Sequence, residues 1–330
     1  MGWRTPAACM AAVLLSVSWA GSFQPAMARP QTEPSAQDIE SIQIRPNVFV
    51  IFGAGANITV QVGPQGLVLV DSGSVMHADR ARAALNAISS APVRLIVNTS
   101  ADLDHVGGNE VLARGGLSIV PNAFNAGASQ AGILAHENVL LQISAPSGQN
   151  ATLPLGAWPT ETYTSRMKSM YFNGDGVQVI RETGAHSDGD SVVFFRRADV
   201  IATGDILDLR HFPVIDPARG GSIQGEIDAL NRLLELAIPA MPLVYEEGRT
   251  LLVPGHGRIA DHAELVEYRD MITIIRDSVQ RLIERGMTVD EVKAANPTQG
   301  YRVRFGRESG PWTTDMFIEA IYRGLRQAAS

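Results

Sequence analysis

Cysteine is almost absent from this sequence, because its 330 residues contain a single one, Cys9. An apolar stretch over 7–20 follows Arg4, and an A-x-A cleavage site ends at Ala28, which is the pattern of a secretory signal peptide. We therefore expect cleavage after Ala28 and a periplasmic or secreted protein with no membrane segment after cleavage. Cys9 would leave with the signal peptide over 1–28, so the mature chain would have no disulfide, thiol nucleophile or thiolate metal ligand.

A large excess of charge is also missing. The 27 Lys and Arg residues against 34 Asp and Glu give a net charge of −7, without any block of like charge. This balance argues against nucleic acid as a partner and favours a small-molecule substrate. The sequence contains no P-loop and no H-E-x-x-H pattern. Gly53-Ala54-Gly55 begins like a dinucleotide loop, but Ile58 stands where the third glycine belongs.

Short β-type runs and helical patterns alternate after a flexible leader over 29–41, which is rich in Pro, Gln, Ser and Thr. Runs of apolar and β-branched residues predict strands over 42–51, 58–62, 67–70, 93–97, 117–120, 177–180, 191–195, 200–202 and 251–253. Apolar spacing predicts helices over 78–88, 109–113, 135–143 and 225–237. The alternation favours one large layered α/β domain.

The last part of the chain differs in kind, because apolar residues repeat there at three- and four-residue steps. This spacing predicts amphipathic helices over 265–283, 288–295 and 313–327. We expect these helices to close over the same core or to form an appendage on it, rather than an independent domain. They also offer a surface through which two copies of the chain could pair as a homodimer.

Metal-ligand residue types gather at the ends of predicted strands, in loops where a sheet edge can assemble a site. Four such loops each carry a histidine, an aspartate or both. They are 98–109 with Asp104 and His105, 184–190 with His186, 203–205 with Asp205, and 254–257 with His256. Imidazole nitrogen and carboxylate oxygen are ligands for hard or borderline divalent ions. The pattern therefore predicts a metal site.

This run of motifs resembles the metallo-β-lactamase superfamily over roughly 42–260. In that superfamily a strand ends in N-T-H-x-H-x-D-H-x-G-G-N, and a later G-x-H, T-G-D and P-G-H-G supply the other ligands. The resemblance implies an αββα sandwich and a metallo-hydrolase that binds two zinc ions or other divalent metals. It implies a domain over 42–260, followed by a C-terminal helical extension over 261–330 that packs on the same domain.

The resemblance also implies a role for each matched residue. Asp104, His105 and His256 match the ligands of the second metal, and Asp205 matches the carboxylate that bridges both metals. His186 matches the third histidine of the first metal site. A further match, Asp71, corresponds to an aspartate at a strand end that lies beside the metals without binding them. Four histidines lack this spacing and are expected on the surface or in packing contacts: His77, His136, His211 and His262.

Two positions depart from the superfamily pattern, because Ser100 and Asp102 replace the first two histidines of the motif. A serine hydroxyl is a poor zinc ligand, whereas a carboxylate is an acceptable one. We expect Ser100 to form hydrogen bonds, and Asp102 to be either a ligand or a solvated surface carboxylate. The first site would offer Asp102, His186 and Asp205, an oxygen-rich set that favours manganese, iron or magnesium. We expect one firmly bound ion, zinc, at the second site.

The expected activity is hydrolysis by a metal-bound hydroxide that attacks an ester, lactam, thioester, phosphoester or sulfoester. Asp104 or Asp102 would orient the water or accept its proton. The fold does not choose among these substrates. Two other classes remain open: a non-catalytic metal- or ligand-binding protein that has lost the first metal site, and a redox protein that uses iron.

Overall fold

The computed structural model describes residues 1–2, 39–119, 129–145, 151–241 and 248–328. The chain divides into Met1–Glu33 and Pro34–Ser330, and the description below concerns the second unit. Cys9 and Ala28 lie outside the described residues, so signal cleavage and export stay predictions. Within the described ranges, no helix is both long and apolar enough to cross a membrane.

The first sheet has seven strands that follow one another in chain order. They are β1 (Glu40–Arg45), β2 (Val48–Phe52), β3 (Ile58–Gly63), β4 (Gly66–Val70), β5 (Val93–Val97), β6 (Gly132–His136) and β7 (Glu161–Tyr163). β1 to β4 form an antiparallel meander, because only short turns connect them. β4 to β7 run parallel, and the longer connections between them carry helices.

The second sheet has five strands in the order β12-β11-β10-β9-β8. They are β8 (Met167–Phe172), β9 (Asp175–Arg181), β10 (Ser191–Phe195), β11 (Val200–Asp208) and β12 (Leu251–His256). Three of the pairings are antiparallel, whereas β11 and β12 run parallel. The crossover between β11 and β12 contains helix α5 (Ile223–Leu236), whose first turn is capped by Ser222.

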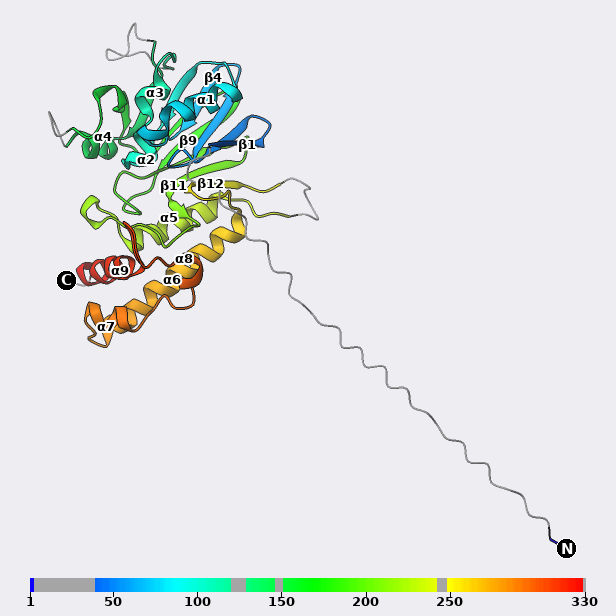
Figure 1. Ribbon diagram of the computed structural model, residues 1–330, viewed down its shortest axis with the longest axis vertical. Helices are drawn as coiled ribbons and strands as arrows, with labels where there is room; N and C mark the ends of the chain where they lie inside the picture. The colour runs from blue at the N-terminus through cyan, green and yellow to red at the C-terminus, as the bar shows by residue number, and fades with distance from the viewer. Residues whose placement is uncertain (3–38, 120–128, 146–150, 242–247, 329–330) are drawn as a thin grey trace. The chain divides into compact units, whose positions relative to one another are not determined.

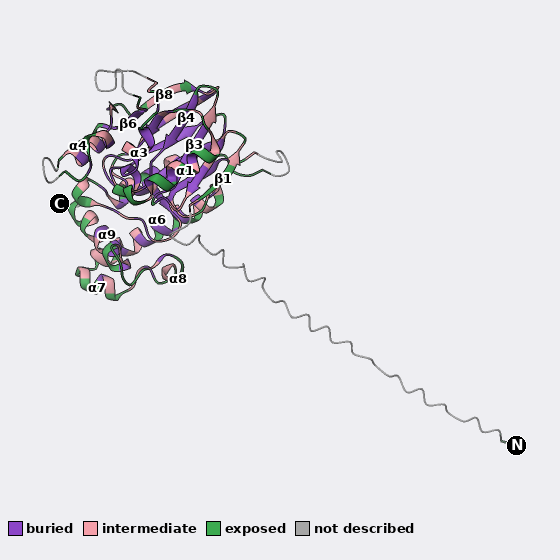
Figure 2. Ribbon diagram, turned by 45° about the horizontal axis from the view of Figure 1, so that its top comes forward, coloured by how far each residue is buried: buried purple, intermediate pink, exposed green. Residues whose placement is uncertain are grey.

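The two sheets pack face to face on a shared apolar core. Val68 and Leu95 of the first sheet belong to the same buried cluster as Val179 and Phe195 of the second. Helices α1 (Ala78–Ile88) and α3 (Asn109–Ala113) cover the outer face of the first sheet, and α5 covers that of the second (Figure 1). The inner strands β3 and β4 are mostly buried on both faces, as Figure 2 shows. The predicted αββα sandwich is confirmed.

Four further helices follow β12: α6 (His262–Glu284), α7 (Val289–Ala294), α8 (Arg302–Phe305) and α9 (Thr314–Ala328). α6 packs against α5 and α9, and Tyr268 and Ile275 of α6 are fully buried in the cluster that covers the second sheet. Phe317 of α9 stacks on Phe212 with ring centroids 4.9 Å apart. The extra C-terminal helices of the predicted fold are therefore present. The domain boundaries and the homodimer stay predictions.

Several predicted elements differ from the observed ones. The run over 42–51 is two strands, β1 and β2, because a turn at Pro46 and Asn47 interrupts it. The described part of 117–120 is not a strand. The predicted helix over 135–143 is the end of β6 followed by α4 (Glu137–Ser144), since a short apolar run does not distinguish a buried strand from a helix. The sequence patterns do not predict β7 and β8, and β8 is an edge strand of mostly exposed or half-buried residues.

The stacked pair Phe212 and Phe317 tests whether the C-terminal helices share the core. We expect Phe317→Ala to lower the free energy of unfolding by about 3–5 kcal/mol, because it leaves a cavity in a packed cluster. Met316 on the same helix is 43% exposed, so Met316→Ala should change stability by about 0.5 kcal/mol or less. Urea denaturation measures both variants. Equal stability of the two would contradict a shared core.

Candidate metal centre

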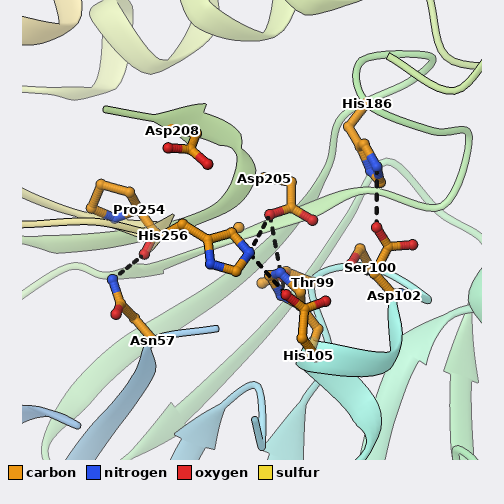
Figure 3. Close-up of polar contacts among 12 residues, drawn as sticks. Asn57, Thr99, Ser100, Asp102, His105, His186, Asp205, Asp208, Pro254 and His256 are labelled. Atoms are coloured by element: carbon orange, nitrogen blue, oxygen red, sulfur yellow. Dashed lines mark hydrogen bonds and ion pairs between the residues drawn. The ribbon is translucent and has the colours of Figure 1, made fainter. Parts of the chain in front are cut away.

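The candidate ligands meet at one edge of the sandwich, and all except His186 follow or lie in strands that run parallel in pairs. His186 lies in the loop between the antiparallel strands β9 and β10. Asp71 follows β4, and the 98–109 segment follows β5, its parallel neighbour. Asp205 lies in β11, and His256 ends β12, which is parallel to β11. Carboxyl ends of parallel strands form a common edge where ligand sites are usual. Figure 3 shows the side chains converging there.

One group of ligand atoms, which matches the second metal of the superfamily pattern and is called the second group, consists of Asp104, His105 and His256. His256 Nε2 lies 3.0 Å from Asp104 Oδ2 and 3.5 Å from Asp205 Oδ1. His105 Nε2 lies 3.0 Å from the same Asp205 oxygen. Ligand atoms each about 2.1 Å from one tetrahedral ion are about 3.4 Å apart, which is close to these spacings. The residues of the second group therefore fit a bound divalent ion.

The other group, called the first group because it matches the first metal site, consists of Asp102, His186 and Asp205. His186 Nε2 lies 3.3 Å from Asp102 Oδ2, yet this buried nitrogen has no hydrogen bond of good geometry among the described residues. A buried polar atom without such a bond calls for an explanation, and a cation between the nitrogen and the carboxylates supplies one. The structure thus brings all six predicted ligands together in two groups. Their binding of metal stays a prediction.

Two of the three metal-facing histidines, His105 and His186, have an aspartate on the other ring nitrogen, whereas Nδ1 of His256 has no hydrogen-bond partner among the described residues. Asp71 Oδ2 lies 2.8 Å from His105 Nδ1, and the backbone N–H and hydroxyl of Thr99 also donate to this carboxylate. Asp190 Oδ1 lies 3.3 Å from Nδ1 of His186. A carboxylate in this position fixes the tautomer and leaves Nε2 free to bind metal. Sequence reasoning missed Asp190, although an acidic residue four positions after a candidate ligand was a usable signal.

Two glycines of the strand-end motifs permit the close approach of the loops. Gly204 has φ +56°, and a Cβ there would lie 2.6 Å from Thr99 Oγ1. A Cβ on Gly255 would lie 2.8 Å from Asp205 Oδ1. Both distances are too short for a side chain. Glycine is therefore required at positions 204 and 255 for Asp205 to lie beside His256.

The Gly53-Ala54-Gly55 turn lies against the loop that carries Asp104. The backbone N–H of Ala56, which follows this turn, donates to the Asp104 carbonyl at 3.1 Å. The side-chain amide of Asn57 donates to the carbonyl of Pro254 at 2.9 Å (Figure 3). It also donates to the carbonyl of Gly257 at 2.9 Å. The segment therefore joins the loop of Asp104 to the loop of His256.

Electrostatics in the site favour positive charge. Burial alone would lower the pKa of His105, but the carboxylates of Asp205 and Asp71 outweigh burial and raise this pKa well above its usual value. Burial would raise the pKa of Asp102, but His186 and Arg219 bring it down to about 2. Asp205 is likewise held ionised, because His105 outweighs the effect of burial on its pKa. A cluster of ionised carboxylates at this edge attracts a cation.

Other polar residues near the edge have other contacts. Ser100 is 1% exposed, and its hydroxyl accepts a hydrogen bond from the backbone N–H of Asp102 at 3.3 Å. Asp102 is half-buried, with a side chain 27% exposed, and Arg219 Nη1 lies 2.5 Å from its Oδ1. Sequence reasoning missed Arg219, which is 117 residues away in the chain. The remaining histidines belong to neither ligand group: His77, His136, His211 and His262.

Asp71 offers a test of the second group. We expect Asp71→Asn to weaken metal binding there by about 10–100-fold, because an amide N–H facing His105 Nδ1 would move the ring proton to Nε2. Asparagine tolerates the left-handed backbone of Asp71, whose φ is +63°, so the fold should survive. Zinc competition with a chelator measures the affinity, with Asp228→Asn on the exposed face of α5 as the control. Unchanged affinity for Asp71→Asn would contradict this role.

Comparison with known proteins adds an independent finding. Residues 52–116 match the family model of the Metallo-beta-lactamase superfamily. Among curated proteins, no sequence match is found. The matched segment contains Asp71, Ser100, Asp102, Asp104 and His105.

Solved structures resemble the fold. The stereoselective inverting sec-alkylsulfatase from Pseudomonas sp. aligns with TM-score 0.60, 17% identity and 86% of this chain. A double mutant of the sec-alkyl sulfatase PisA1 aligns with TM-score 0.62, 16% identity and 86% coverage. The chain spans 50% of the length of each of these two. A metallo-beta-lactamase from Pontibacter korlensis aligns with TM-score 0.51 and 17% identity over 72% of this chain and 99% of its own. The resemblance inferred from the motifs is confirmed: residues 52–116 match the metallo-β-lactamase superfamily in sequence, and the described chain has the fold of that superfamily.

Proposed function

We propose that the protein is a metal-dependent hydrolase that acts outside the cytoplasm on an ester, lactam, thioester, phosphoester or sulfoester. The observation that carries the proposal is the convergence of three imidazoles and three carboxylates in two groups with metal-ligand spacing. The superfamily match supports hydrolysis. The predicted signal peptide over 1–28 supports periplasmic or secreted location.

The residues of the second group would hold zinc, together with Asp205, and those of the first group would hold zinc, manganese or iron more weakly. When bound, such an ion lowers the pKa of a water molecule and polarises the bond to be cleaved. Asp71 and Asp190 keep the Nε2 atoms of His105 and His186 directed at the site. Asp104 has the most exposed side chain of the six candidate ligands, at 39%, so it is the one placed to orient water or accept a proton.

A pocket of about 200 Å³ adjoins Asp102 and could take part of the substrate. Its lining combines the apolar Leu103, Ile143 and Leu153 with the polar Gln142 and Thr152. Arg219 also lines it, but this guanidinium already contacts the carboxylates of Asp102 and Asp216. The positive charge of Arg219 is therefore compensated. We infer that the pocket takes an uncharged part of an ester, thioester or lactam in preference to a second anionic group.

Activity after reconstitution with zinc or manganese tests the proposal. A panel of aryl esters, a chromogenic lactam, a phosphodiester and an alkyl sulfate covers the reaction classes. We expect turnover of at least one, and a loss of about 10²–10³-fold in kcat/KM for His256→Ala, since a bound ion contributes several kcal/mol. His262→Ala is the matched control, because His262 belongs to neither ligand group.

A non-catalytic binding protein is the second candidate, favoured by one observation. Ser100 and Asp102 stand where the superfamily pattern has histidines, and Asp102 is already paired with Arg219. Inactivity of the fully metallated protein across the whole panel would refute the hydrolase and favour this reading.

A further inference from the structure

We propose that Arg219 is a positioning residue that fixes the carboxylate of Asp102 for the first group. Arg219 Nη1 donates to Asp102 Oδ1 at 2.5 Å, which leaves Oδ2 facing His186 Nε2 at 3.3 Å. The consequence for metal binding rests on the proposed function, whereas the contacts themselves involve only side chains of this chain. Arg219 would then compensate for the loss of a histidine at position 102.

Asp102 has no local contact that selects its side-chain orientation. It stands at the N-cap position of α2 (Leu103–Val106), yet its carboxylate accepts no capping hydrogen bond there. Its side chain is 27% exposed, and its backbone N–H donates to Ser100. An aspartate with this freedom samples several rotamers. The contact with Arg219 selects the rotamer that faces His186.

Arg219 is itself held in place by the loop that carries it. Its Nε donates to Asp216 Oδ2 at 2.6 Å, and Asp216 Oδ1 accepts from the backbone N–H groups of Ala218 and Arg219. The backbone N–H of Asp216 donates to the His186 carbonyl at 2.9 Å, and that of Asp188 donates to the Arg219 carbonyl at 2.8 Å. Arg219 therefore joins the loop of Asp102 to the loop of His186.

The same kind of support is present at two of the three histidine ligands. Asp71 holds the Nδ1 of His105, and Asp190 holds the Nδ1 of His186, while each Nε2 faces the site. Arg219 holds Oδ1 of Asp102 while Oδ2 faces the site. In all three cases a partner fixes the atom that is not offered to the metal, which is how outer contacts orient metal ligands.

A guanidinium beside a metal site also repels a cation, so the charge balance decides whether Arg219 strengthens or weakens metal binding by the first group. Asp216 lies 2.6 Å from Arg219 and offsets its charge, which leaves orientation as the larger contribution. Lysine would keep the charge but has no planar fork that reaches two carboxylates at once. Arg219→Lys therefore separates positioning from charge.

Titration of metal-free protein with zinc, and separately with manganese, tests the consequence. We expect the ion of the second group to bind unchanged in Arg219→Met and Arg219→Lys, and the ion of the first group to bind about 10–100-fold more weakly in both. Arg269→Met is the matched control, because Arg269 is 28% exposed and has two partners on the helical side, Asp270 and Asn231. Unchanged or tighter binding by the first group in Arg219→Met would overturn the proposal.

Crystals of the metal-free protein test the positioning without metal or turnover. In Arg219→Met, the Asp102 carboxylate should leave the orientation that faces His186, while Asp71 and His105 stay in place. If wild-type protein takes up no metal, the proposed function fails, and these crystals alone decide the present proposal. An Asp102 carboxylate that keeps its orientation in Arg219→Met would overturn it.

Discussion

The carboxylate of Asp205 lies where the two groups of ligand atoms meet, and the arrangement of the site depends on it. Its Oδ1 lies 3.0 Å from His105 Nε2 and 3.5 Å from His256 Nε2, and the residue also completes the group of Asp102 and His186. Asp205 lies beside His256 because β11 and β12 are parallel neighbours and because Gly255 has no side chain to separate them. The α5 crossover and the packing of α5 on the second sheet provide that arrangement.

The two groups differ in how their ligands are supported. The second group has two histidines on strand-end segments, and Asp71 orients one of them through a carboxylate fixed by Thr99. The first group has one histidine and depends on Asp102, whose orientation comes from a side chain on a distant loop. The second group offers two imidazoles and the first group only one, so we infer that the second group binds zinc more tightly.

The sequence predicts the ligands better than it predicts their support. Asp104, His105, His186, Asp205 and His256 stand in short motifs at strand ends, so local pattern was sufficient to find them. The contact of Arg219 with Asp102 depends on how two loops meet in three dimensions, and no local pattern encodes it. The αββα layers follow from strand and helix periodicity. β8 is not predicted, because an edge strand carries little apolar alternation.

The most direct test of this account is the number of metal ions that the purified protein retains, measured by elemental mass spectrometry after dialysis against metal-free buffer. The account predicts about one ion per chain in the native protein, held by Asp104, His105, Asp205 and His256, and a second ion only when excess metal is added. Two ions held equally tightly would contradict the inequality of the groups. No ion in the protein, even after reconstitution with zinc, manganese and iron, would contradict the metal centre itself.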